Sequence, residues 1–289
     1  MQTPKSSLAP LLFIIFLSSF TLAQTPAVSV RGAASMLMLG QKVVAFYSSE
    51  YPGSIVQVNV SESPDQMPSG SSTIWQSVHP VTPIEKRALN GRFGSVSRQI
   101  PIAIQGVLVI VNKHNSVQSL SVDQLRCIYL GQITNWKDVG GSDERIRLYS
   151  TESLVGGSLF FRDLVLHDEE INDAMRGYVN PRETAQAVAT DESAIGLTPV
   201  AGDASVKYLS VRRASNSPAI EGSSENVRSL AYPLSSYLYW SFSDLHGPAI
   251  SQFVQFTLSS RGQMAIEASG CYPLNPSERN KGMVALATK

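Results

Sequence analysis

The sequence predicts an α/β protein with two lobes, and three observations support this class. Stretches with helical spacing alternate along the chain with short alternating or continuous apolar stretches. Residues 106–111 form a continuous apolar run, which is typical of a strand covered on both faces. The chain has 289 residues, which exceeds the usual size of a single domain, so two lobes are expected, with one large domain as the alternative.

The first half of the chain begins with a β/α unit. Apolar residues at helical spacing over residues 36–47 end at Tyr51-Pro52-Gly53, and residues 55–60 read as a strand. A loop rich in serine and proline follows at residues 61–72, and the strand pattern returns at residues 100–104.

The next helix is marked at both ends. Ser121 and Gln124 form a capping box, and Leu120 and Leu125 occupy the positions of a hydrophobic staple. The helix is expected to stop at Gly131, since glycine is the common residue just after a helix end.

The second half continues the alternation. A strand at residues 145–150 leads through a loop with a glycine pair into a helical pattern that starts at Leu159, an arrangement that favours anion binding by backbone amides but also suits a simple tight turn. Further on, the pattern predicts strands at residues 194–197, 208–211 and 237–240 and a helix at residues 250–258.

The first residues indicate export. Lys5 precedes an apolar stretch at residues 8–20, and Thr21-Leu22-Ala23 offers the small residues of a signal-peptidase site, so cleavage is expected near Ala23. The apolar stretch is shorter than the roughly 20 residues needed to span a bilayer, so no stable membrane insertion is expected. The mature protein is expected to be periplasmic or secreted.

Charge excludes one class of partner. The chain has 23 basic and 23 acidic residues, and removing Lys5 with residues 1–23 leaves 22 basic and 23 acidic. Capture of nucleic acid by bulk charge is therefore not expected.

Several segments, in their order along the chain, resemble the phosphate-binding proteins of bacterial ABC transporters. The most specific is Tyr-Leu-Gly-Gln-Ile-Thr-Asn-Trp at residues 129–136. Others lie at residues 31–36, 75–85, 194–197 and 232–235, and the tail at residues 253–274 resembles the family's closing helix. The resemblance covers nearly all of the mature chain.

The resemblance implies a periplasmic-binding-protein fold of the second type, in which two α/β lobes are joined by crossing strands and close on a ligand in the cleft between them. Residues 24–104 and 239–289 are then expected to form one lobe, and residues 105–238 the other. The implied function is that of an exported solute-binding protein for phosphate or another small oxyanion or organic ligand. An ABC permease is the candidate partner, no cofactor is expected, and a monomer is expected.

The resemblance also transfers a candidate ligand site to the first lobe. In the family a first loop presents hydroxyl and backbone donors to phosphate, and the matching residues here are Ala34, Ser35 and Met36. Ser77 and His79 lie near the position where relatives carry an Asp, Ser or Arg on the ligand. His79 would supply a positive charge only when protonated, and it also fits a surface histidine before Pro80.

The second part of the implied site is the glycine loop. Relatives carry an Arg, an acidic residue and a Ser-Gly-Ser-Gly-Thr-like run there, and the candidate ligand residues at the matching positions are Thr151, Ser153, Gly156 and Gly157. The arginine is absent from these positions. Losing its paired hydrogen bonds and two hydroxyls predicts a degenerate phosphate site, weaker by roughly three powers of ten.

An enzyme is not expected. The sequence has no Gly-x-Ser-x-Gly elbow, no P-loop and no histidine pair at metal-ligand spacing, so neither catalytic residues nor metal ligands are predicted. The alternative to a receptor is a non-transport interaction or regulatory protein with a vestigial cleft. The two cysteines, Cys127 and Cys271, fit either a disulfide or two separate buried thiols.

Overall fold

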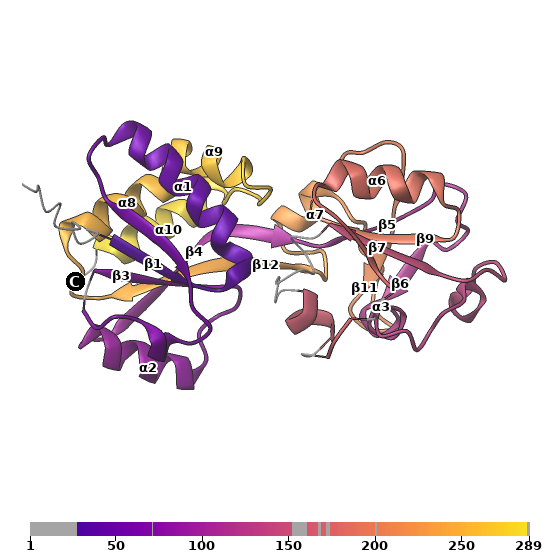
Figure 1. Ribbon diagram of the computed structural model, residues 1–289, viewed down its shortest axis with the longest axis horizontal. Helices are drawn as coiled ribbons and strands as arrows, with labels where there is room; N and C mark the ends of the chain where they lie inside the picture. Colours follow the sequence, from indigo (N-terminus) through magenta and orange to yellow (C-terminus); the bar gives the residue numbers. More distant parts are fainter. Residues whose placement is uncertain are drawn as a thin grey trace, which may run out of the picture.

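The structure is a computed structural model that describes residues 28–70, 72–151, 161–166, 169–171, 174–199 and 201–287. Two α/β bodies, which we call lobe 1 and lobe 2, lie side by side along the longest axis (Figure 1). Each is built around its own five-stranded sheet. The predicted two-lobed α/β fold is confirmed. The predicted signal peptide, residues 1–23, lies outside the described residues.

The sheet of lobe 1 has the strand order β2-β1-β3-β12-β4. The first three neighbours run parallel, whereas β12 is antiparallel to both β3 and β4. Its strands are β1 (Val28–Gly32), β2 (Val56–Val60), β3 (Thr73–Ser77), β4 (Ser97–Gly106) and β12 (Ser235–Ser243). The parallel set places the carboxyl ends of β1, β2 and β3 at one edge of the lobe.

Helices cover both faces of this sheet. This is needed because successive residues of a strand point to opposite faces and both faces carry apolar side chains. Ile74 joins the main core, while its neighbour Trp75 packs with Met67, Leu89 and Phe93 on the side of α2. On the main-core side α1 packs against α8 and α9, and α10 packs against α8 and β4. The helices are α1 (Leu37–Glu50), α2 (Pro83–Phe93), α8 (Pro248–Leu258), α9 (Ser260–Glu267) and α10 (Pro276–Ala287), with short turns η1 (Ala34–Met36) and η2 (Pro64–Gln66).

The sheet of lobe 2 has the order β10-β5-β9-β7-β8. A separate two-stranded ladder joins β11 to β6. The strands are β5 (Leu108–Val111), β6 (Ser119–Ser121), β7 (Arg147–Thr151), β8 (Arg176–Tyr178), β9 (Ala194–Thr198), β10 (Lys207–Tyr208) and β11 (Ser210–Arg212).

Successive residues of β7 face different helices. Tyr149 packs with Ala185 and Val188 of α6, whereas Leu148 belongs to the main core together with Ile128 of α3. The helical segments of lobe 2 are α3 (Val122–Tyr129), η3 (Trp136–Val139), η4 (Arg162–Leu166), α6 (Pro181–Thr190) and α7 (Ser224–Arg228).

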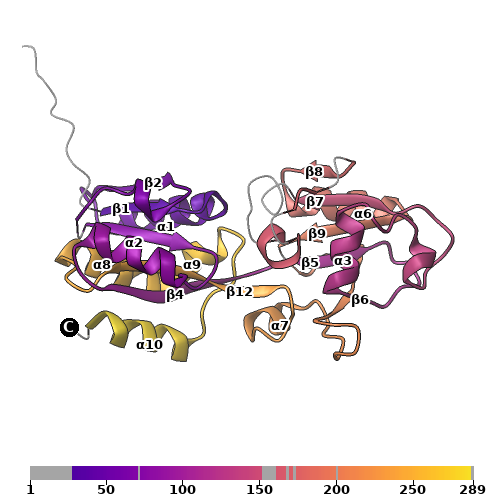
Figure 2. The same cartoon turned by 90° about the horizontal axis from the view of Figure 1, so that it is seen from below.

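Two extended segments cross between the lobes. β4 continues through Val107 into β5, and Leu234 leads into β12, where Ser235 pairs with Gly106 (Figure 2). The lobe boundaries predicted at residues 104 and 238 both fall inside this paired ribbon and stay a prediction. Both ends of the described chain belong to lobe 1, because β1 and α10 are both part of it (Figure 1).

Most predicted elements are confirmed. The capping box is present at the start of α3, and the helix at residues 250–258 is α8. The strand predicted at residues 208–211 is instead two short strands, since Tyr208 pairs with β5 and Ser210 pairs with β6. A change of pairing partner is invisible in an apolar pattern.

The two cysteines are not bonded to each other. Cys127 lies in α3 of lobe 2 and Cys271 precedes α10 of lobe 1, and both are free thiols. Burial raises the pKa of Cys271 to about 11, so this thiol is protonated at neutral pH. In the part of the chain that the structure describes, we find no helix of the length and hydrophobicity that a membrane span requires.

Candidate functional site

A cavity of about 470 Å³ lies between the lobes. Its lobe 1 wall is made by the residues that follow the carboxyl ends of three parallel strands: Ala33 and Ala34 after β1, Ser61 and Glu62 after β2, and Val78 and His79 after β3. Parallel strands end at the same edge, which is where open α/β sheets bind ligands. We call it the interlobe cavity.

Three of the predicted site residues line this wall: Ala34, Ser77 and His79. The Ser77 hydroxyl donates to the carbonyl oxygen of His79 at 2.9 Å and accepts from the Gln99 amide at 3.4 Å. These bonds fix the turn that presents His79. The His79 Nδ1 atom lies 2.9 Å from the Pro80 carbonyl oxygen and 3.9 Å from the Glu85 carboxylate.

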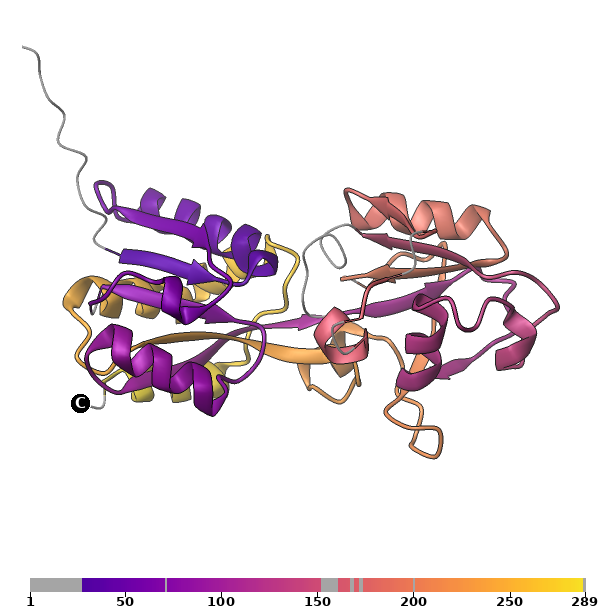
Figure 3. The ribbon, with the colours of Figure 1, turned by 60° about the horizontal axis from the view of Figure 1, so that its bottom comes forward.

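Lobe 2 contributes a cation. Arg162, the first residue of η4, lines the interlobe cavity opposite the lobe 1 residues. Figure 3 shows this helical segment on the side of lobe 2 that faces lobe 1. Its position is fixed because Val165 and Leu166 are buried in the main core.

Two carboxylates of lobe 1 offset the positive charge of Arg162 at this cavity. Glu62 and Glu85 both line the interlobe cavity. Glu85 is held by the capping box of α2, where its carboxylate accepts from the Thr82 N–H at 2.7 Å. Among the described residues that line the cavity, Arg162 is therefore the one permanent positive charge beside these two carboxylates.

Several buried polar groups at this wall have no hydrogen-bond partner among the residues that the structure describes. The indole nitrogen of Trp75 and both polar atoms of the Gln76 amide are buried without a hydrogen bond, and both residues line the interlobe cavity. The Ser35 hydroxyl, one residue beyond Ala34, is unpartnered as well. Buried polar groups are normally bonded to protein or water, so these groups mark a place where a polar ligand or water supplies the missing bonds.

The remaining predicted residues are less favourably placed. The Met36 side chain is buried in the main core, and its N–H bonds to the Ala33 carbonyl at 3.0 Å. Thr151 is the buried last residue of β7, and its hydroxyl pairs with that of Thr184 at 3.0 Å. Neither is among the residues that line the interlobe cavity. Ser153, Gly156 and Gly157 lie outside the described residues.

Sequence reasoning missed Arg162, Glu62, Glu85 and Gln76. Arg162 follows Phe161 in the apolar pattern after the glycine loop, and an arginine next to a candidate anion loop was the available signal. The two glutamates gave no signal, since charged residues at strand and helix ends are usually solvated. Within the described ranges no cluster of three or more His, Cys, Asp or Glu residues suits a metal ion.

Two α/β lobes, two crossing segments and a cavity between the lobes define the class of two-lobed solute-binding proteins. Residues 21–261 match the family model described as the PBP superfamily domain. The chain therefore belongs to the PBP superfamily.

Individual relatives agree with this assignment. The phosphate-binding protein PstS of Pseudomonas aeruginosa is 21% identical over 260 residues, which cover 83% of this chain and 80% of that protein. A structure described as a possible phosphate binding protein from Planctomyces limnophilus superposes with a TM-score of 0.77 at 20% identity, over 90% of this chain and 97% of that one. An ABC-type phosphate transport receptor from Vibrio cholerae gives 0.67 at 23% identity, over 85% and 99%. At these identities, the solved structures establish the fold alone.

Proposed function

We propose that this protein is an exported solute-binding protein of an ABC transport system, and that it captures a small oxyanion in the interlobe cavity. Phosphate is the first candidate, because the relatives are named for phosphate binding. This evidence favours a receptor over a regulatory protein with a vestigial cleft.

The observation that carries the proposal is the position of Arg162. It brings a guanidinium from lobe 2 to a cavity whose other wall consists of loops at the ends of parallel strands. A planar guanidinium donates paired hydrogen bonds to an oxyanion, which compensates in part for the arginine that is absent at Thr151. Glu62 and Glu85 then explain a weaker affinity than that of a fully cationic site.

Ligand capture is proposed to close the lobes by a hinge. The two crossing segments pair at Gly106 and Ser235. Each is a single extended stretch of the chain. A ligand held by both Arg162 and lobe 1 favours the closed arrangement by its differential contacts. The permease is the proposed partner that recognises the closed form.

The test is a binding panel on the purified mature protein. Phosphate, sulfate, methylphosphonate and small organic acids are compared by calorimetry and by melting temperature, at matched ionic strength. A receptor shows a saturable rise in stability, about 2.7 kcal/mol at a ligand concentration of one hundred times Kd. Absence of binding by every member of the panel would overturn the proposal.

A further inference from the structure

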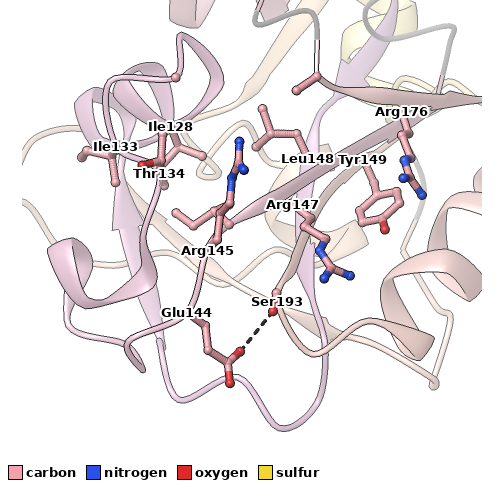
Figure 4. A pocket seen from close by; sticks show the side chains of 13 residues that line it. Ile128, Ile133, Thr134, Glu144, Arg145, Arg147, Leu148, Tyr149, Arg176 and Ser193 are labelled. Carbon is pink, nitrogen blue, oxygen red and sulfur yellow. Dashed lines mark hydrogen bonds between the residues drawn. The ribbon is translucent and has the colours of Figure 1, made fainter.

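A second cavity, of about 390 Å³, lies in lobe 2, and none of the described residues that line it also lines the interlobe cavity. It lies at the start of β7, where β8 is not yet paired with that strand. The pairing of β7 with β8 begins at Tyr149 and Arg176. Three arginines line it: Arg145, Arg147 and Arg176 (Figure 4). We call it the arginine pocket.

One of these arginines is neutralised within lobe 2. Arg147 Nη1 lies 3.2 Å from Asp191 Oδ2, and the same oxygen accepts from the Tyr149 hydroxyl at 2.8 Å. Among the described residues that line the pocket, the one carboxylate is that of Glu144, which accepts from the Ser193 hydroxyl at 3.1 Å.

The other two guanidiniums have no such partner. Neither Arg145 nor Arg176 forms an ion pair with another residue of the described ranges. Both side chains are exposed at the rim of the pocket. Two positive charges at one cavity repel each other and favour an anion that reaches both.

Apolar surface separates the two charges. Leu148 and Ile128 line the pocket and are almost fully buried beneath it. In Figure 4, Arg145 and Arg176 flank Leu148 on opposite sides. The volume of the pocket is at the lower end of the range of small-molecule sites, about 300 to 1,000 Å³.

We propose that the arginine pocket binds a small aliphatic dicarboxylate. One carboxylate lies on Arg145 and the other on Arg176, each through charge-assisted hydrogen bonds. The methylene chain lies along the part of Leu148 that reaches the pocket surface, which is 8% of that residue. This ligand class follows from two separated cations with an apolar surface between them, and it is independent of the ligand in the interlobe cavity.

The experiment titrates the mature protein with the series from malonate to adipate, at constant ionic strength, followed by calorimetry and by amide chemical shifts. We expect an optimum at one chain length, which reports the separation of the two guanidiniums, and weaker binding of the monocarboxylate butyrate. Arg145→Gln and Arg176→Gln are each expected to lower the affinity about tenfold or more.

Two controls locate the binding. Arg213→Gln removes an exposed arginine elsewhere in lobe 2 and is expected to leave the titration unchanged. Arg162→Gln is expected to weaken oxyanion binding in the interlobe cavity without affecting the dicarboxylate. The proposal is overturned if no dicarboxylate binds, if affinity does not depend on chain length, or if either Arg145→Gln or Arg176→Gln leaves it unchanged.

Discussion

The two walls of the interlobe cavity are built differently. Lobe 1 supplies most of the wall from the ends of β1, β2 and β3, and two of its residues are the carboxylates Glu62 and Glu85. Lobe 2 supplies the single cation Arg162 among the described residues that line the cavity. Lobe 1 therefore sets most of the shape of the cavity, and lobe 2 supplies the positive charge that the proposed oxyanion site requires.

This difference predicts that ligand binding depends on closure. A ligand held by lobe 1 alone meets hydroxyls and unpartnered amides but also two negative charges. Contact with Arg162 of lobe 2 adds a positive side-chain charge next to the ligand. The open protein is therefore expected to bind oxyanions poorly, and most of the affinity arises when the lobes meet.

The largest expected effect comes from breaking the lobe 1 wall. Gly32 has φ +143°, and a Cβ there would lie 2.0 Å from the Gln76 carbonyl oxygen. Gly32→Ala is expected to cost about 3 kcal/mol or more, measured by urea unfolding. Gly53→Ala is the matched control, because Gly53 also has positive φ but nothing lies within 4 Å of its Cβ position, and about 1 kcal/mol is expected. Equal losses for both variants would contradict this view of Gly32.

The next-largest expected effect is on ligand affinity, and it distinguishes the positive charge of lobe 2 from the negative charges of lobe 1. Arg162→Gln is expected to weaken phosphate binding about tenfold to a hundredfold, and Arg162→Lys to lie between, because lysine lacks the planar fork. Glu62→Gln should act in the opposite direction and strengthen binding about two- to fivefold by removing a repulsion. Calorimetry at low and high salt measures both. An unchanged affinity in Arg162→Gln would place the anion elsewhere.

A smaller effect concerns helix capping, which is equivalent in the two lobes. Thr82 caps α2 of lobe 1 and Ser121 caps α3 of lobe 2, each with a complete capping box. Thr82→Ala and Ser121→Ala are each expected to lower the free energy of unfolding by about 1 kcal/mol. Ser121→Ala should leave oxyanion affinity unchanged, since Ser121 is not among the described residues that line the interlobe cavity. A loss of affinity in this variant would show that lobe 2 contributes more than Arg162.

The smallest expected effect is on the alkylation rate of the two free thiols, one in each lobe. The pKa of Cys271 is raised to about 11 by burial, and only the thiolate reacts with iodoacetamide. About one Cys271 thiol in a thousand is ionised at pH 8, so its alkylation should be slow and rise about tenfold per pH unit up to roughly pH 10. Peptide mass spectrometry measures this, with Cys127 as the reference thiol. Rapid alkylation of Cys271 at pH 8 in the folded protein would contradict the raised pKa of this thiol.

Much of the fold could be predicted because local patterns agree with it. The apolar run at residues 106–111 includes β5, and the capping box at Ser121 starts α3. Where prediction differed, tertiary pairing decided: the run at residues 208–211 is divided between two sheets by its partners β5 and β6. For the site, Ala34, Ser77 and His79 line the interlobe cavity, whereas Thr151 pairs with Thr184 in the interior.

The sequence by itself determined the alternation of helices and strands, the helix caps, and the loops that follow the parallel strands of lobe 1, because these depend on neighbours a few residues apart. Only the tertiary structure decided that Arg162, Glu62 and Glu85 line one cavity, and that Arg145 and Arg176 flank Leu148. Those arrangements depend on the path of the crossing segments and on strand register. Both are set by contacts between residues far apart in the chain, and a local pattern carries no record of them.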